Sequence, residues 1–589
     1  MKKTVYLLLA LLLLTSALSA CGKDTPESAG PIYAEHGDIQ REALGSLAPA
    51  ADTGAVLSSL ASAGQGVSAN WQAEELETPV PGPRLNVRET SGDTAVTDGS
   101  YIYMIDSYGL ITVSAAGTAS EVRAYTKVER TGERWGDCLY LWQDKVAVLW
   151  SSPDYDEAGS WQGSIQTWVV VFSVADPVAP KQLATLAVDG SLVSANLLDG
   201  TLCVVTQKTL LNLPQADQAD SLLPQLHENG KTFTLQAGEI YLSPDPAKTA
   251  LTVAAAIRLE DGRFADALAF TDGTDAVYAN GQDLYLARTC WKEEGSAPRQ
   301  EGSYQVVDYH SAAETELKRL RLDGGLRLDG GCVIYGALTN PNGMDLLNGQ
   351  LRIATRVDER NYAIYNDEAH GWSNLEQRDR VTESQLAILD GDLNVVGALA
   401  KLGGAEGIAS CAFLQANAWI TAGATLTAAD LSDPTAPKLS ESFQTGGETL
   451  LLRTLGKGCV LAFSVPGLGG KVRLAVYDLS DPASPRQLDS MELDAMPTGD
   501  LTARGAFLAD AETGWIGWPS AGKDGTEYRL VRWTGSKLDD QGALSLNYVA
   551  DDARSLLLNG TLYLCSPAQV AVTDPEAMKV LTTVSNAVG

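Results

Sequence analysis

From about residue 86 onward, the chain alternates short apolar runs with turn residues, and this pattern matches strands better than helices. Five of the runs begin directly after an Asp-Gly or Asn-Gly pair, which supplies the positive φ angles of a tight hairpin. The alternation of apolar and polar residues after each pair is typical of a half-buried strand. We therefore predict an all-β structure built from antiparallel hairpins. The five turns are Asp98-Gly99, Asp199-Gly200, Asn280-Gly281, Asn348-Gly349 and Asn559-Gly560.

A second recurring motif ends a strand at an Asp-Pro pair. Asp in the first position and Pro in the second favour a type I turn, and Pro cannot continue a strand ladder. The motif occurs at Asp176, Asp433 and Asp481, with a shorter copy at Asp574. Asp433 and Asp481 are 48 positions apart, and Asp574 follows 93 positions later, nearly twice that distance. A period in the high forties that contains only strands and turns is the signature of a β-propeller blade.

The length beyond residue 86 sets the expected size of the propeller. No amphipathic helical pattern of useful length occurs there, which excludes helical solenoids and α/β folds. We predict a single β-propeller of about eight four-stranded antiparallel blades, with seven as the alternative. We expect the propeller to close by pairing the beginning of this region with its end. Two polar, turn-rich stretches, near residues 206–238 and 356–380, exceed one period and are expected to be long loops on one face.

Three segments carry a resemblance to a known family. They are Val96–Tyr103, Asn340–Thr355 and Leu389–Gly397, and the Asp-Pro repeats accompany them. On these residues, the chain from Thr97 to the C-terminus resembles the bacterial secreted β-propeller domain family, exported proteins of unknown activity that are distantly similar to WD40 propellers. The resemblance implies one propeller domain over residues 86–589 in an exported protein. It supplies no catalytic residues, because none are assigned in the family.

The first residues have the layout of a secretory signal. Two lysines precede the apolar run Val5–Leu14, which is too short to be a convincing spanning helix. The run leads to Leu18-Ser19-Ala20-Cys21, which resembles a bacterial lipobox, where the Cys sulfur takes a diacylglycerol. We predict a lipoprotein signal peptide over residues 1–20 and a lipid on Cys21. The alternative is an ordinary cleaved signal with a chance Cys at its end.

The segment between this signal and the propeller is expected to be a spacer. Residues 21–85 are rich in Ala, Gly, Ser and Glu and end in a proline-rich stretch. Such a composition is typical of a flexible tether, and we expect one short helix near Ile39–Leu47. The protein is therefore predicted to lie outside the cytoplasm, anchored to the bacterial cell membrane by the lipid on Cys21.

Composition and charge limit the partners. The 589 residues include 43 basic and 74 acidic side chains, a formal net charge of −31. So much negative charge argues against nucleic acid as a partner and against anionic lipid bound through the protein surface. With four histidines in the chain, we expect no metal site, and we expect no cofactor. Seven cysteines besides Cys21 lie mostly in apolar runs and are expected to be small buried strand residues rather than disulfides.

The search for chemistry yields two candidate binding residues and no catalytic set. The sequence lacks a G-x-S-x-G elbow and an H-E-x-x-H zinc motif, so we expect that the protein is not an enzyme. Trp161 and Trp372 both lie in polar segments that we expect to be loops. An exposed Trp on a loop is a candidate anchor for a sugar or peptide partner. The alternative is that each indole folds back onto a blade edge.

These features predict a cell-surface lipoprotein whose propeller is a non-catalytic binding or scaffolding platform for an extracytoplasmic protein or glycan. Closure removes free sheet edges, while loops on both faces stay free to contact partners. One alternative is an extracytoplasmic hydrolase or lyase that acts through loop carboxylates at the propeller channel. Another is a structural assembly factor that works through other envelope proteins. The fold does not choose among them, because propellers host all three.

Overall fold

The computed structural model describes residues 41–43, 47–63 and 91–586, with breaks at 107, 129–133, 156–160, 340–342, 368, 404–406, 457, 467–469, 523–525 and 547–552. Nearly all regular structure within these ranges is strand, so the all-β prediction is confirmed. The predicted signal peptide and Cys21 lie outside the described residues.

Strand pairing produces eight sheets, which contain nine four-stranded antiparallel units among the described residues. We number these units blades 1 to 9 in chain order. Seven blades have a sheet of their own, whereas blades 4 and 5 share one because β21 pairs with β25. Blade 1 contains β3 (Ala95–Thr97), β4 (Tyr101–Ile105), β5 (Gly109–Ser114) and β6 (Val122–Lys127); blade 2 contains β7 (Trp135–Trp142), β8 (Lys145–Tyr155), β9 (Trp161–Ser173) and β10 (Lys181–Asp189); blade 3 contains β11 (Ser191–Leu198), β12 (Thr201–Thr209), β16 (Ala250–Arg258) and β17 (Arg263–Thr271).

The middle blades carry the longest strands, and the last blades are compact. Blade 4 contains β18 (Ala276–Asn280), β19 (Asp283–Gly295), β21 (Tyr304–Leu322) and β22 (Leu326–Tyr335); blade 5 contains β24 (Met344–Leu347), β25 (Gln350–Asp367), β26 (Trp372–Leu389) and β27 (Val395–Leu399). Blade 6 contains β28 (Ser410–Leu414), β29 (Asn417–Ala422), β30 (Thr425–Asp430) and β31 (Lys438–Gln444); blade 7 contains β32 (Glu448–Thr454), β33 (Cys459–Val465), β34 (Val472–Asp478) and β35 (Arg486–Leu493). Blade 8 contains β36 (Leu508–Ala509), β37 (Trp515–Ala521), β38 (Thr526–Trp533) and β39 (Leu538–Ser545); blade 9 contains β40 (Arg554–Leu558), β41 (Thr561–Cys565), β42 (Gln569–Asp574) and β43 (Lys579–Ser585).

The expected eight blades equal the number of sheets and fall one short of the four-stranded units. Two stretches expected to be long loops form regular structure instead. Residues 206–238 hold the end of β12, the 3₁₀ helix η3 (Ala216–Leu222) and the hairpin β13 (Gln225–Glu228)–β14 (Lys231–Thr234), which extends the sheet of blade 2. Residues 356–380 lie mostly within β25 and β26. Four other short elements lie between these strands: η2 (Gly117–Ala119), η4 (Ala237–Glu239), β15 (Ile240–Leu242) and β23 (Ala337–Leu338).

Three of the five predicted hairpin turns have two positive φ angles, whereas Asp98-Gly99 and Asn280-Gly281 have one, at the glycine. In Asp199-Gly200, Asn348-Gly349 and Asn559-Gly560, both residues have positive φ angles, between 42° and 78°. This is the type I′ geometry, whose twist matches that of the flanking strands. The Asp-Pro pairs also lie between strands as predicted, with Asp433 accepting a hydrogen bond from the Thr435 amide at 3.0 Å.

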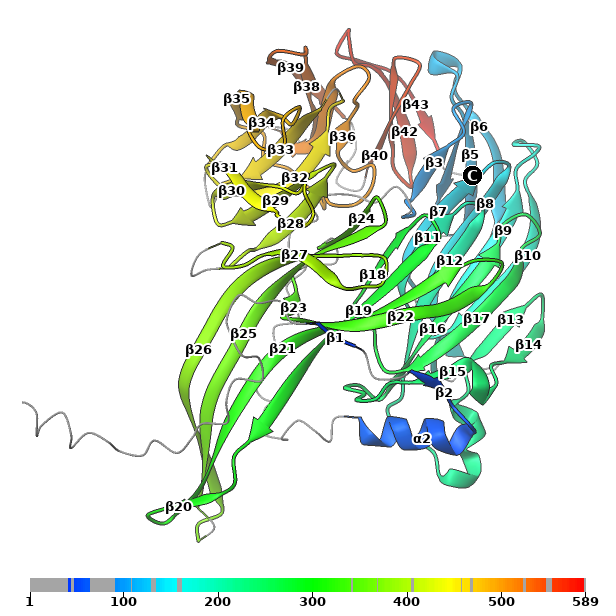
Figure 1. Cartoon of the computed structure of the whole chain (residues 1–589). Coiled ribbons are helices and arrows are strands. Elements are labelled where there is room, and N and C mark those ends of the chain that lie inside the picture. Colours follow the sequence, from blue (N-terminus) through cyan, green and yellow to red (C-terminus); the bar gives the residue numbers. More distant parts are fainter. Residues whose placement is uncertain are drawn as a thin grey trace, which may run out of the picture.

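Figure 1 shows the blades following one another in chain order. Apolar contacts between the faces of neighbouring blades hold the propeller together. Each consecutive pair of blades shares one buried cluster, and one further cluster joins blade 9 to blade 1. In this last cluster, Ile102 and Ile111 of blade 1 meet Tyr563 and Val570 of blade 9. The expected pairing of the chain's beginning with its end is wrong, because blades 1 and 9 are each built from one continuous segment. Closure depends on face packing instead.

Polar contacts add to this closure between blade 1 and the last blades. The Tyr563 hydroxyl accepts a hydrogen bond from the Gly117 amide at 2.9 Å. The Arg554 guanidinium donates to the Asp93 carboxylate at 2.7 Å, and both side chains are largely buried. Residues just before the first strand are thereby fixed to the first strand of blade 9.

Part of the region expected to be a free tether packs on the propeller. β1 (Arg41–Ala43) pairs with β22, and β2 (Ala48–Pro49) pairs with β15. The helix expected near Ile39–Leu47 lies further along, as α2 (Thr53–Ser62). The Asp52 carboxylate caps this helix by accepting a hydrogen bond from the Ala55 amide. Val56 and Leu60 of the helix are buried against the segment that connects β12 to β16 in blade 3. None of the helices in the described part of the chain is long and apolar enough to cross a bilayer.

The closing interface generates a stability prediction. Ile102→Ala removes a fully buried side chain from the cluster between blades 1 and 9. We expect the free energy of unfolding to fall by about 2–5 kcal/mol, because a cavity remains where the side chain packed. Leu581→Ala, at a side chain that is 38% exposed in the outermost strand of blade 9, is the matched control and should change it by less than about 1 kcal/mol. Urea denaturation measures both; equal effects would contradict closure by packing.

Candidate functional site

Two long hairpins project from blades 4 and 5 and form an arm. β19, β21, β25 and β26 have 13, 19, 18 and 18 residues, whereas a strand in a globular protein usually has about 5–6. The parts beyond the propeller, residues 291–313 and 357–382, are what we call the arm. Pairing of Gln305–Ala312 with Glu359–Asn366 joins the two hairpins into one sheet. Figure 1 shows the arm running away from the blades, with β20 (Arg299–Glu301) at its far end.

The base of the arm is fixed to blade 3 by a buried cluster of charges. Arg288 of β19 is 3% exposed and donates to two carboxylates, those of Asp272 and Glu316. Asp272 directly follows β17 of blade 3, so this contact joins two blades. Lys318 lies 2.5 Å from Glu316 on its other side. Burial alone would lower the pKa of Arg288, but the two carboxylates raise it, so the guanidinium stays charged.

Glu314 continues this charged face toward the arm. Its side chain is 3% exposed. Glu314 lies two residues before Glu316, on the same face of β21, and is opposite Cys290 of β19. Burial, together with the negative charge of Glu316, raises the pKa of Glu314 to about 7. The arm therefore has a titratable carboxyl at its base.

The tip of the arm holds one of the two predicted binding residues. We define the tip as residues 299–306, 364–367 and 369–376. Trp372 is the first residue of β26, opposite Asp367, and is 43% exposed. It was expected in a loop and instead starts a strand, and it does not fold back onto a blade edge. Trp161 likewise starts a strand, β9 of blade 2, opposite Tyr155. The structure thus places the two residues on different blades.

Two tyrosines accompany Trp372 at the tip. The rings of Tyr304 and Trp372 have centroids 5.5 Å apart at 59°, and those of Tyr304 and Tyr365 are 6.1 Å apart at 85°. Because the planes are strongly inclined, the three rings form a corner rather than a flat stack. Both tyrosines are only half-buried. Such amphipathic rings offer an apolar surface to a ligand at little cost in side-chain entropy.

Charged side chains at the tip and in the adjoining part of the arm form ion pairs. Arg299 donates to Asp308, and Arg378 lies 2.7 Å from the other oxygen of the same carboxylate. His370 contacts Asp367 at 2.9 Å. The Asp367 carboxylate also accepts from the amides of Ala369 and His370 at 3.1 Å and so fixes the turn that presents Trp372.

A cavity lies where the first strands of blades 9, 1, 2 and 3 converge. It has a volume of about 320 Å³, and its lining includes Asp93, Tyr140, Leu197, Arg504 and Leu556. Asp93 is the only carboxylate among the lining residues that the structure describes. Burial raises its pKa to about 6, although Arg554 opposes this. The paired carboxylates that acid–base hydrolysis needs are absent from this lining.

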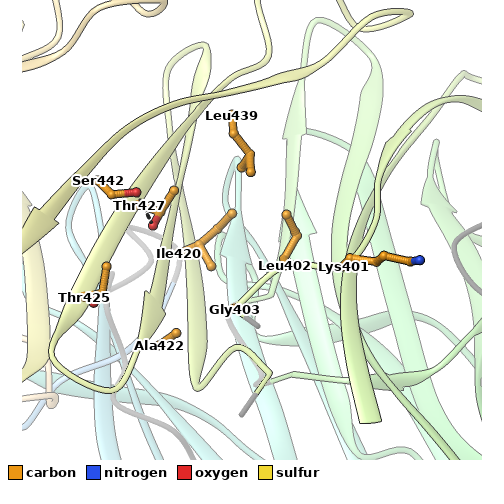
Figure 2. Close-up of a pocket in the computed structure, with 9 residues that line it drawn as sticks. All are labelled: Lys401, Leu402, Gly403, Ile420, Ala422, Thr425, Thr427, Leu439 and Ser442. Atoms are coloured by element: carbon orange, nitrogen blue, oxygen red, sulfur yellow. Dashed lines mark hydrogen bonds between the residues drawn. The ribbon is translucent and has the colours of Figure 1, made fainter. Parts of the chain in front are cut away.

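A recess with a volume of about 470 Å³ lies between blades 5 and 6. Figure 2 shows Leu402, Ile420 and Leu439 among the residues that line it. Its polar wall is formed by hydroxyls, including the pair Thr427–Ser442 at 3.0 Å. The described lining has no His, Cys, Asp or Glu. Elsewhere in the described residues, no group of three or more such side chains could hold a metal ion.

A family model described as "Beta propeller domain" matches residues 87–578 of the chain. The chain belongs to this family. A relative from Methanocaldococcus jannaschii is 21% identical over 533 residues, covering 72% of this chain and 80% of that protein. Another from Archaeoglobus fulgidus is 28% identical over 258 residues, covering 43% of this chain and 36% of that protein. Both carry the description "uncharacterized protein".

Among solved structures, the matches to this Beta propeller domain protein have low similarity. A eukaryotic initiation factor structure aligns with a TM-score of 0.31 and 9% identity, covering 70% of this chain and 90% of that one. An uncharacterized Listeria monocytogenes protein aligns with a TM-score of 0.26 and 10% identity, covering 58% and 89%.

Sequence reasoning missed most of the arm of this propeller. Tyr304 and Tyr365 were not singled out, and residues 356–380 were expected to be a loop. One signal was present: neither Gln350–Asp367 nor Trp372–Leu389 contains a Gly or Pro, so nothing in them breaks a long strand. The cysteines match expectation better, since five of the seven are buried and two are half-buried.

Glu314 generates a prediction about pH. The folded chain keeps this proton up to about pH 7, whereas an unfolded Glu loses it near 4.5. Its contribution to stability is therefore complete below about pH 4.5 and is lost as the pH rises toward 7. Glu314→Gln cannot titrate, so its free energy of unfolding relative to wild type should rise between pH 4.5 and 8, by up to about 3 kcal/mol.

Urea denaturation at several pH values measures this difference. Glu294→Gln, an exposed carboxylate on the adjacent strand β19, is the matched control and should follow the wild-type profile. If the wild type and Glu314→Gln keep a constant difference from pH 4.5 to 8, the buried carboxyl is not protonated as described.

Proposed function

We propose that the protein is a lipid-anchored, non-catalytic binding platform outside the cytoplasm, in which the propeller supports the arm and the arm tip contacts an envelope protein or glycan. The lipid on Cys21 comes from the lipobox resemblance. The observation that carries the proposal is the arm, a sheet of four strands far longer than a blade needs, ending in half-exposed aromatic rings.

The construction of the arm suits presentation of a surface at a fixed position. Its hairpins are joined by a continuous ladder, and its base is tied to blade 3 through Arg288. Ordered side chains on regular strands lose less entropy on binding than side chains on free loops. This supports binding by the tip rather than by the loops of the blades.

The described cavities favour binding over catalysis. The recess near Leu439 is lined by aliphatic and hydroxyl groups and by Lys401. The cavity near Asp93 has one carboxylate, which is paired with Arg554. The hydrolase alternative needs two carboxylates placed around a bond, and neither cavity supplies them.

Photo-cross-linking in the cells that make the protein tests this proposal. A photo-reactive residue at Leu375, which is 40% exposed at the tip, should give adducts with other envelope components. The same residue at Val178, which is 43% exposed in a turn of blade 2, is the matched control and should give none. Adducts from Val178 alone, or robust hydrolysis of a polysaccharide, peptide or ester by the purified full chain, would contradict the proposal.

A further inference from the structure

We propose that the ligand of the arm tip is a neutral glycan of equatorially linked sugars. This rests on the proposed function and names its partner. Such sugars have flat faces of C–H groups that stack on aromatic rings, and a rim of hydroxyls that form hydrogen bonds. The tip offers groups for both kinds of contact.

The aromatic corner provides the stacking surface. The Trp372 indole is 43% exposed, and Tyr304 lies against it at 59°, with Tyr365 beyond. A sugar stacked on the indole would therefore have a second ring at its edge. Trp372 is the most exposed of the three rings, so its indole carries the stacking surface.

Neutral polar groups lie beside the aromatic corner, where the charged side chains of Glu376 and Arg378 also hydrogen-bond Tyr365. The Ser373 hydroxyl donates to the Asn366 side-chain oxygen at 2.7 Å, and Asn374 follows on the exposed edge. The His370 side chain is 73% exposed beside Asp367. Amides, hydroxyls and imidazoles can both donate and accept, which matches the mixed hydrogen bonding of sugar hydroxyls.

The charges of the protein favour a neutral ligand over an acidic one. Arg299 and Arg378 are both paired with Asp308, so neither guanidinium is free to hold a carboxylate or sulfate. The chain as a whole carries a formal charge of −31, which repels acidic polymers. The other charged ligand to consider is a basic protein segment. The small size of the tip argues against it.

The tip is too small for a stable protein interface. An aromatic side chain has about 150–250 Å² of surface, and the three at the tip are each less than half exposed. Together they offer about 300 Å² at most, well below the roughly 800 Å² that each partner of a stable protein complex buries. A few sugar residues would cover it completely.

Affinity electrophoresis of the full chain tests this inference. The protein is run in a detergent without a sugar headgroup, through native gels that contain hydroxyethyl cellulose or arabinoxylan as neutral polymers. Polygalacturonate and poly-L-lysine serve as acidic and basic polymers. We expect at least one neutral polymer to retard the protein, and Trp372→Ala to weaken that binding by about tenfold.

Two controls separate this effect from misfolding and from general loss of an exposed Trp. Gln377→Ala alters the same strand at an exposed residue outside the tip, and Trp135→Ala removes an indole that is 41% exposed on blade 2. Both should bind within twofold of wild type. Wild-type affinity in Trp372→Ala, no retardation by the neutral polymers, or retardation by a charged polymer alone would overturn the inference.

The cross-linking experiment shows which proposal has failed. If a photo-reactive residue at Leu375 gives adducts but no neutral polymer retards the chain, the proposed glycan ligand is wrong and the proposed binding platform is retained. If neither occurs, both are wrong.

Discussion

Face-to-face apolar packing between neighbouring blades is the constraint on which the rest of the molecule depends. A single blade has two apolar faces and cannot bury either alone, so each is stable only between two neighbours. This requirement holds at the junction of blades 9 and 1 as well. There the packing of Ile102 with Tyr563 and Val570 replaces the expected pairing of the beginning of the region with its end. The propeller is therefore closed by side chains rather than by a shared sheet.

The arm follows from a local departure from this rule. In blades 4 and 5, β21 and β25 continue beyond the point where blade faces meet and then pair with each other. The backbone groups of these extensions are satisfied by that joint ladder, which is why long strands can leave the propeller. The cluster of Arg288, Asp272 and Glu316 then fixes their base against blade 3. The position and rigidity of the tip thus come from the β21–β25 ladder and the Arg288 cluster, which also belong to the strands of the blades.

The sequence predicted what short-range chemistry determines. Asn348-Gly349 and Asn559-Gly560 form the expected turns because few other pairs accept two positive φ angles, and the Asp-Pro motif gave the blade period. It could not predict the partner of each strand. β25 pairs beyond its own blade with β21, a contact across about fifty residues that no local pattern records. The charges of β21 show the same limit, because Glu316 and Lys318 resemble a solvated strand face until Arg288 and Asp272 are placed beside them.

At the candidate site, Trp372 was identified for its exposure, whereas Tyr304 and Tyr365 join it only through the pairing of two hairpins. Amide hydrogen exchange of the full chain tests the central claim, that the arm is a rigid extension of the propeller. The account predicts that the β21–β25 ladder, Gln305–Ala312 with Glu359–Asn366, is protected as strongly as the inner strands of the compact blades. Exchange of these amides at the rate of an unstructured chain would contradict it.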